Sequence, residues 1–144
     1  MRADSLIAAD ACQDYVKSSR LEWLDTNGTG FYAMGTVSGA RTRRYHGLLN
    51  GPAGPNQPTQ VWLSSLEETF VQGGQRYNLG AQRYSGTTSP RGFDMLSEFR
   101  LSPHATWVYR INEVAITREV MLIDGLPALL VRYCSSDDAE LEVR

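Results

Sequence analysis

Cysteine is scarce in this sequence, and the two cysteines present, Cys12 and Cys134, lie far apart. Two thiols at that separation are too few for a disulfide framework, and they lack the close spacing of a Cys-based metal site. Reduced thiols in a cytosolic compartment are the simpler interpretation, and a single long-range disulfide is the alternative. The cysteine content therefore favours a cytoplasmic protein.

A surplus of basic residues and a long apolar run are also missing. Lys and Arg number 14 against 16 Asp and Glu, for a net charge of −2, whereas proteins that bind nucleic acid need a basic surface. This balance argues against nucleic acid as a partner. No stretch approaches the roughly 18 apolar residues of a membrane-spanning helix, and Asp4 and Asp10 interrupt the apolar region at 6–9. We expect neither secretion nor membrane insertion.

Helical periodicity is the third feature in short supply. Residues 4–17 allow one short helix, with Ser5 as a candidate N-cap. Short alternating segments with Gly and Pro turns fill most of the rest, which predicts an all-β antiparallel sandwich with little helix. A chain of 144 residues has the usual size of one domain. We therefore expect a single β-sandwich domain over residues 1–144.

One hairpin can be placed from its turn residues. Gly73-Gly74 separates the strand-like segments 68–72 and 75–79. Two glycines tolerate the positive φ angles of a two-residue hairpin turn. This turn sets Phe70 opposite Tyr77.

The last third of the chain has the pattern of an antiparallel meander. Apolar residues alternate over four segments, 107–111, 114–122, 129–133 and 141–143. Asp124-Gly125 predicts a two-residue turn that sets Pro127 opposite Leu122. Because proline has no N–H, the strand that contains Pro127 should have a free or irregular outer edge there.

Two boundaries follow from prolines and from the end of the chain. Residues 51–58 contain prolines and glycines that predict a loop, after which a strand begins at Val61. The final strand reaches Arg144 without a stop signal. We expect the chain to be a piece of a longer protein.

The most informative stretch is residues 27–49. Its glycines would be unfavourable in a helix or an ordinary strand, so the backbone here needs positive φ or a close approach to another segment. Strand-forming residues lie between them, which predicts two short strands joined by a Gly-bearing bend. The bend should bring together the polar side chains of Arg41, Arg43, Arg44 and His46.

Three motifs could indicate a catalytic or ligand-binding site, but the surrounding sequence argues against each. Gly28-x-Gly30-x-x-Ala33 matches a dinucleotide fingerprint, but no βαβ unit surrounds it. Glu67 and Glu68 are neighbours on a strand and point to opposite faces, so they cannot flank one glycosidic bond. Solvated or interfacial carboxylates are the better interpretation of that pair. His46 and His104 have no Glu or Cys at ligand spacing, and we expect neither a metal nor an organic cofactor.

The three tryptophans and the basic cluster each allow two interpretations of their role. Trp23, Trp62 and Trp107 could stack on sugar rings, but a place in the core or at a domain interface is favoured for each. The cluster from Arg43 to His46 is poor core material. It forms either an ion-pair network within the domain or a functional surface.

The glycine-rich stretch and a later run carry a resemblance to a known family. The segments are Glu22-Trp23-Leu24, Thr26-Asn27-Gly28, Gly30, Tyr32-Ala33, Gly35-Thr36-Val37-Ser38-Gly39-Ala40, Thr42-Arg43-Arg44-Tyr45-His46-Gly47-Leu48-Leu49 and Leu63-Ser64-Ser65-Leu66-Glu67-Glu68-Thr69. In this order they resemble the N-terminal domain of bacterial and archaeal-type glycogen debranching enzymes, the amylo-alpha-1,6-glucosidase family. The sequence departs from that pattern at Thr29, Phe31, Met34 and Arg41, and Phe31 stands where a glycine is expected.

The resemblance implies a role within a larger enzyme. A supersandwich-like N-terminal domain would pack on a C-terminal catalytic (α/α)6 barrel of the same polypeptide, which hydrolyses the α-1,6 branch points of a branched α-glucan. This chain would then contain no catalytic residue and would help to shape substrate access. Candidate residues at the substrate entrance or the domain interface are Asn27, Arg43, Arg44, Tyr45 and His46. The alternative is a free-standing carbohydrate-binding or protein-interaction module.

Overall fold

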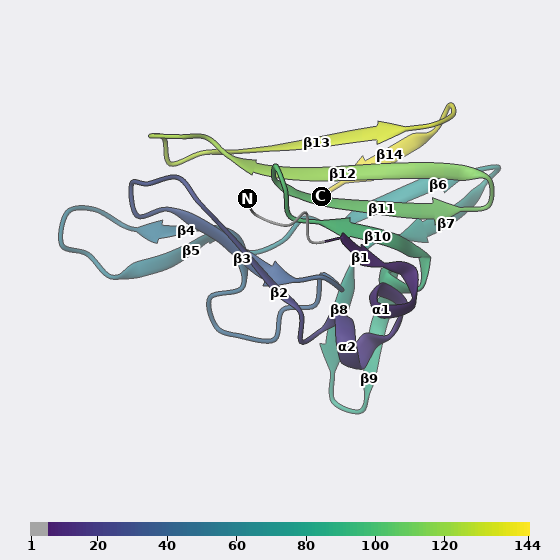
Figure 1. The fold of residues 1–144 in the computed structure, drawn as a ribbon, viewed down its shortest axis with the longest axis horizontal. Coiled ribbons are helices and arrows are strands. Elements are labelled where there is room, and N and C mark those ends of the chain that lie inside the picture. The colour runs from purple at the N-terminus through teal and green to yellow at the C-terminus, as the bar shows by residue number, and fades with distance from the viewer. Residues whose placement is uncertain (1–5) are drawn as a thin grey trace.

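The computed structural model describes residues 6–144, and its regular structure consists mainly of antiparallel strands (Figure 1). The sheets do not close into a barrel, so the predicted all-β antiparallel sandwich with little helix is confirmed. One layer is a large five-stranded sheet in the order β1-β10-β11-β12-β13. Its strands are β1 (Leu6–Ala8), β10 (Leu96–Arg100), β11 (Ala105–Ile111), β12 (Val114–Leu122) and β13 (Leu129–Ser135).

The remaining strands form three smaller sheets. A four-stranded sheet has the order β2-β3-β4-β5, a three-stranded sheet the order β14-β6-β7, and β8 pairs with β9. Their strands are β2 (Glu22–Thr26), β3 (Tyr32–Thr36), β4 (Gly47–Pro52), β5 (Thr59–Leu63), β6 (Glu68–Gln72), β7 (Gln75–Asn78), β8 (Ala81–Tyr84), β9 (Thr87–Arg91) and β14 (Glu140–Val143). The short helices are α1 (Ala9–Gln13), α2 (Tyr15–Ser18) and the 3-10 helix η1 (Gly92–Met95).

The main core lies between the large sheet and the four- and three-stranded sheets. Trp107 of β11 is at its centre, edge-to-face with Trp23 at 5.2 Å and with Phe99 at 5.0 Å between ring centroids. Its indole Nε1 donates a 2.9 Å hydrogen bond to the carbonyl of Val37. The core prediction therefore holds for Trp23 and Trp107, but Trp62 is 54% exposed on β5.

The hairpin at Gly73-Gly74 forms as predicted. Phe70 pairs with Tyr77 across β6 and β7, and the two glycines have positive φ angles of 57° and 77°. Local turn chemistry alone sets this register, because a two-residue loop permits only one pairing of the flanking strands.

The predicted two-residue turn at Asp124-Gly125 is wrong. Leu122 pairs with Leu129, and the N–H of Ile123 donates to the carbonyl of Ala128 at 3.0 Å. Pro127 lies within a longer turn, where its missing N–H leaves no ladder bond unmade. Pro127 precedes β13 and is not part of it, although β13 is an edge strand of the large sheet.

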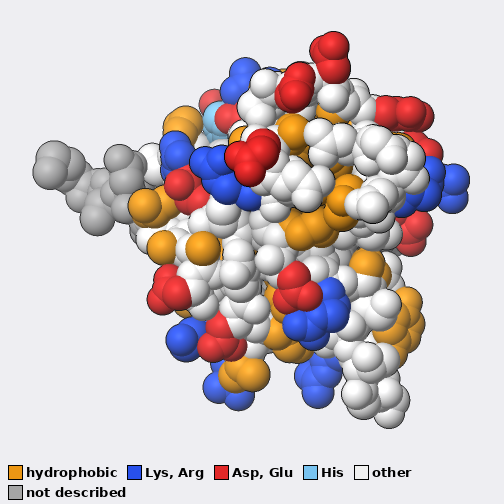
Figure 2. Space-filling model, turned by 90° about the vertical axis from the view of Figure 1, so that its right-hand side faces the viewer, with side chains coloured by type: hydrophobic (Ala, Val, Ile, Leu, Met, Phe, Trp, Pro, Cys, Tyr) orange, Lys and Arg blue, Asp and Glu red, His pale blue; other side chains and the backbone are white. Residues whose placement is uncertain are grey.

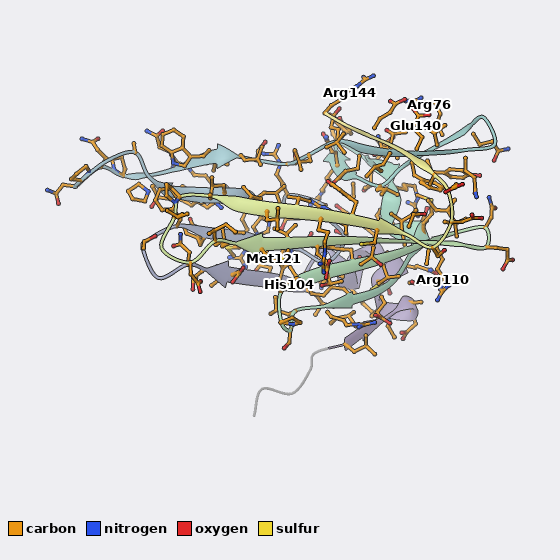
Figure 3. The ribbon with its side chains drawn as sticks, turned by 90° about the horizontal axis from the view of Figure 1, so that it is seen from above. Arg76, His104, Arg110, Met121, Glu140 and Arg144 are labelled. Carbon is orange, nitrogen blue, oxygen red and sulfur yellow. The ribbon has the colours of Figure 1, made fainter. Side chains whose placement is uncertain are left out.

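The expected four-strand meander is only partly correct. β11, β12 and β13 form it, but β14 leaves the large sheet and pairs with β6, with Leu141 opposite Phe70. A bidentate ion pair between Arg76 of β7 and Glu142 of β14, with N–O distances of 2.7 and 2.5 Å, spans the three-stranded sheet. Figure 3 shows Arg76 and Glu140 at this corner of the molecule, close to Arg144.

Three element boundaries differ from the predictions. β4 continues through Pro52, so the expected loop at 51–58 begins later, and β5 begins at Thr59 rather than Val61. The expected single helix in 4–17 is replaced by β1 and two short helices, and the Ser5 cap lies outside the described residues. Asp14 caps α2 by accepting a 3.2 Å hydrogen bond from the N–H of Lys17.

The state of the cysteines and the charges on the surface can be compared with the sequence composition. Cys12 is buried and Cys134 is exposed, and both are free thiols rather than a disulfide. Among residues 6–144, no helix is long and apolar enough to cross a membrane. Figure 2 shows a face of the molecule on which acidic and basic side chains are interspersed.

Candidate functional site

The bend between β3 and β4 is the place where the sequence predicted a functional surface. Two short strands do flank a bend, and Gly39 within it has a φ angle of 82°, which a residue with a side chain adopts only under strain. Arg41, Arg43 and Arg44 are exposed there, whereas His46 is buried. The arginines and the histidine therefore do not share one surface.

His46 is held inside the domain by two hydrogen bonds. Its Nδ1 accepts from the N–H of Thr42 at 3.0 Å, so the ring proton is on Nε2, which donates to Oε1 of Glu22 at 3.0 Å. Oε1 of Glu22 also lies 2.5 Å from Nε of Arg43, in an ion pair. Glu22 therefore forms an ion pair with Arg43 and a hydrogen bond with His46, and is their common partner within the domain.

Arg44 and Tyr45 are free of this network. The guanidinium of Arg44 lies 5.3 Å from the centroid of the Tyr45 ring, a cation–π arrangement. Tyr45 is 38% exposed, and Arg44 forms no ion pair with any residue from 6 to 144. Both side chains are available to contact another molecule or domain.

Asn27 is a structural residue rather than a surface contact. It is buried, and its Nδ2 donates a 2.6 Å hydrogen bond to the carbonyl of Leu126 in the turn after β12. Its Oδ1 accepts from the N–H and the hydroxyl of Thr29 at 3.0 and 2.8 Å. Asn27 therefore joins the β2–β3 turn to the large sheet.

An open groove lies beside the bend, on the outer face of the four-stranded sheet, and we call it the outer groove. Its lining combines side chains of β2 and β3 with residues of the β2–β3 turn and of the bend: Leu24, Thr26, Gly28, Gly30, Phe31, Tyr32, Met34, Arg43, Arg44 and Tyr45. Three of the five predicted site residues meet here, and Asn27 and His46 do not. No Asp or Glu lines the outer groove.

Phe31 gives this groove a local feature of its own. Its ring lies directly over the backbone of Gly51, where a Cβ atom on residue 51 would overlap it. A bulky residue is tolerated at 31 because Gly30, with a φ angle of 87°, takes the left-handed conformation instead. Phe31 thus adds an aromatic wall to the outer groove.

The second polar site is a buried ion pair that the sequence did not indicate. Oε1 of Glu68 lies 2.8 Å from Nε of Arg118, between the two layers, and also accepts a 2.8 Å hydrogen bond from the hydroxyl of Tyr133. The guanidinium lies 4.8 Å above the Trp107 ring. Glu68 is 2% exposed, so the expectation of a solvated or interfacial carboxylate is wrong for it, although Glu67 is exposed.

The electrostatics of this pair follow from its burial. Burial is the largest influence on Arg118 and by itself lowers its pKa, but Glu68, Tyr109 and Tyr133 together outweigh burial and hold that pKa above its ordinary value. Burial also raises the pKa of the hydroxyl groups of Tyr109 and Tyr133. Arg118 therefore stays charged, and Tyr109 and Tyr133 stay uncharged, at neutral pH.

A signal for Arg118 was present in the sequence. Val114, Ile116 and Val120 are inward-facing residues of β12, and Arg118 occupies the same face of that alternation. A charged residue at an inward position requires a buried partner of opposite charge. The partner could not be chosen from the sequence, because Glu68 lies on a strand of another sheet.

Both histidines pair with carboxylates. Nε2 of His104 lies 3.0 Å from Oε1 of Glu119, and His46 pairs with Glu22. In the part of the chain that the structure describes, no group of three or more His, Cys, Asp or Glu side chains could hold a metal ion.

Comparisons with known proteins agree with the resemblance found in the sequence. The profile of the family described as "Glycogen debranching enzyme N terminal" matches residues 21–144. No curated protein and no solved structure matches the chain. The family match covers β2 through β14, and so includes the outer groove and the buried ion pair. The chain belongs to the family of glycogen debranching enzyme N-terminal domains.

Proposed function

We propose that this chain is a non-catalytic domain of an enzyme that hydrolyses the α-1,6 branch points of a glucan. The observation that carries the proposal is the family match across residues 21–144. The domain acts through its contacts with the catalytic barrel of the same polypeptide, in the cytoplasm, where free thiols persist.

The carboxylates of the chain support a non-catalytic role. Glycoside hydrolysis usually needs two carboxyl groups that face each other across the scissile bond. The outer groove has no carboxylate in its lining, and Glu68 is engaged with Arg118 and Tyr133. Glu22 is likewise engaged with Arg43 and His46.

The outer groove is the surface that we assign to the barrel. Leu24 is 53% exposed and Tyr45 38% exposed, and neighbouring apolar side chains extend the same patch. Contiguous exposed apolar surface marks an interaction site. Arg44 at its rim has no ion-pair partner within residues 6–144, and it suits a carboxylate on the partner domain.

The test compares two exposed leucines in the full-length enzyme. Leu24→Asp places a charge in the outer groove, and Leu130→Asp does the same at an equally exposed position on β13, where Leu130 is 51% exposed. We expect Leu24→Asp to split thermal unfolding into two separate transitions in calorimetry, because a buried unpaired charge weakens the interface. Leu130→Asp should leave unfolding as in the wild type.

Arg44→Ala distinguishes docking from substrate contact. Under our proposal it weakens the coupling of the two unfolding transitions. If kcat/KM on a branched limit dextrin falls while thermal unfolding is unchanged, the groove contacts the glucan and the docking assignment is wrong. If Leu24→Asp and Arg44→Ala both keep wild-type thermal unfolding and wild-type kcat/KM, the groove neither docks the barrel nor contacts the glucan.

A further inference from the structure

The outer groove is wide and mostly apolar. Its volume is about 940 Å³, at the upper end of the roughly 300–1,000 Å³ that pockets for drug-sized ligands have. Several side chains of a partner therefore fit in it together. Phe31 and Met34 are half-buried in its walls, and Leu24 is 53% exposed there. Uncovered apolar surface of this kind favours an apolar partner.

Gly28 leaves part of the groove bare. It lies in the β2–β3 turn with a φ angle of 76°, and a Cβ atom at this position would meet nothing within 4 Å. The space beside its backbone is therefore empty. The backbone of a partner can approach closely where a glycine has no side chain.

Positive charge collects at the bend that borders the groove. Arg41, Arg43 and Arg44 all belong to this bend, and Glu22 is the one carboxylate among residues 6–144 that forms an ion pair with any of them, through Arg43. Arg41 and Arg44 are both exposed. Because the whole chain has a net charge of −2, the positive excess is local. It attracts an acidic partner to this end of the groove in preference to the rest of the surface.

Arg44 and Tyr32 are the donors that can hold a carboxylate at this end. The guanidinium of Arg44 is kept near the groove by its contact with the Tyr45 ring, and its planar shape matches a carboxylate. The pKa of Tyr32 is raised, chiefly by burial and further by the neighbouring Tyr45. The hydroxyl of Tyr32 therefore stays protonated and can donate a hydrogen bond to an anion.

Other classes of partner fit this lining less well. A cation would meet two arginines and no carboxylate, since no Asp or Glu lines the groove. A nucleic acid needs basic residues along the whole path of its phosphates, whereas Arg43 and Arg44 occupy one end. The remaining wall is apolar, so the best match is an apolar group with a single negative charge.

We propose that the outer groove binds an apolar protein segment that carries one carboxylate. Arg44 and the hydroxyl of Tyr32 bind the carboxylate, and the apolar walls pack against the side chains beside it. That this segment belongs to the catalytic barrel rests on the proposed function. Its chemistry follows from the residues of the groove.

A pair of dyes tests this chemistry on the wild-type 144-residue chain. Anilinonaphthalene sulfonate and N-phenyl-naphthylamine have the same aromatic rings, but only the first carries an anionic group. Fluorescence titration should show the anionic dye binding about three- to fivefold more tightly, on the scale of one partly exposed ion pair. The peptide acetyl-Leu-Glu-Phe-amide should displace this dye at lower concentration than the matched acetyl-Leu-Gln-Phe-amide.

Variants of the chain locate the site. Arg44→Ala should remove the preference for the anionic dye while the neutral dye binds as before, and Arg44→Lys should keep most of that preference. Arg110→Ala is the matched control, because Arg110 is also exposed but lies on β11 of the large sheet (Figure 3). Leu24→Asp should weaken the binding of both dyes. Near-UV circular dichroism checks that each variant is folded.

Three results would overturn the inference. Equal binding of the two dyes, or an unchanged preference in Arg44→Ala, would show that charge plays no part in the groove. Displacement of the anionic dye by inorganic phosphate at constant ionic strength would make the groove a phosphate site. A dimer of the chain that depends on Arg44 in sedimentation velocity would make a second copy the occupant.

Failure of this inference and failure of the docking proposal can be told apart. If the anionic dye binds to the full-length enzyme as tightly as to the 144-residue chain, the groove is open in the enzyme. Docking is then wrong, while the preference for a carboxylate stands. If the two dyes bind equally but Leu24→Asp still uncouples the unfolding of the two domains, docking stands and the present inference is wrong.

Discussion

Glu22 and His46 are joined by a 3.0 Å hydrogen bond between Oε1 and Nε2, although 24 positions separate them in the sequence. The side chain of His46 is fully buried, so Glu22 satisfies a donor that water cannot reach. We expect Glu22→Ala to lower the free energy of unfolding by about 1–3 kcal/mol, the usual effect of leaving a buried polar group unpaired. Urea denaturation of the chain measures this loss.

The control for Glu22→Ala is Glu113→Ala. Glu113 is exposed in the β11–β12 turn and forms no ion pair with the described residues, so its removal should change stability by less than about 0.5 kcal/mol. Equal effects of the two substitutions would show that the contact of Glu22 with His46 contributes nothing.

The buried pair of Glu68 and Arg118 should behave non-additively. Arg118→Met leaves a buried carboxylate without its partner, and we expect a loss of about 3–5 kcal/mol. Glu68→Leu should cause a loss of similar size. The double substitution removes both charges and should recover most of that stability in urea denaturation. Simple addition of the two single losses would contradict this interpretation.

Glu119 makes stability depend on pH in the acid range. The hydrogen bond from Arg132, followed by that from His104, lowers the pKa of Glu119 from 4.5 to about 2. A carboxyl group with a lowered pKa in the folded state stabilises the fold above pH 4.5, and its contribution disappears as the pH falls towards 2. The difference in unfolding free energy between the wild type and Glu119→Gln should therefore shrink across that window. A difference that stays constant from pH 5 to pH 2 would contradict the assignment.

The stability loss caused by a substitution at Gly51 should depend on the side chain at residue 31. Gly51→Ala places a methyl group inside the Phe31 ring, and overpacking of this kind destabilises by about 1–3 kcal/mol. In a Phe31→Ala background the same substitution has space, so its effect should be smaller. Melting temperatures of the four chains measure this coupling. An unchanged effect of Gly51→Ala would show that the ring is not the obstacle.

Local features of the fold were predictable because short-range sequence determines them. Gly73-Gly74 requires positive φ and fixes the pairing of Phe70 with Tyr77. The alternation of β11 and β12 likewise follows from which residues are apolar. The turn before β13 was misplaced because Asp124-Gly125 fits several loop lengths, and only the pairing of Leu122 with Leu129 decides among them.

Features that depend on distant partners could not be predicted. The sequence placed β14 next to β13 because they are consecutive, but the half-buried Leu141 of β14 pairs with Phe70 of β6 in another sheet. His46 was expected on a surface because three arginines precede it, and its burial depends on Glu22 of a different strand. Of the candidate site residues, Arg43, Arg44 and Tyr45 lie in the outer groove, and Asn27 and His46 lie beneath the surface.

The pairing of β14 with β6 also bears on the order in which the chain folds during synthesis. β6 and β7 leave the ribosome early as a hairpin, with one edge of β6 unpaired until β14 has been made. An exposed strand edge can pair with other chains. Slow translation between β7 and β14 should therefore favour association of nascent chains through β6, and a chaperone would have this edge to protect.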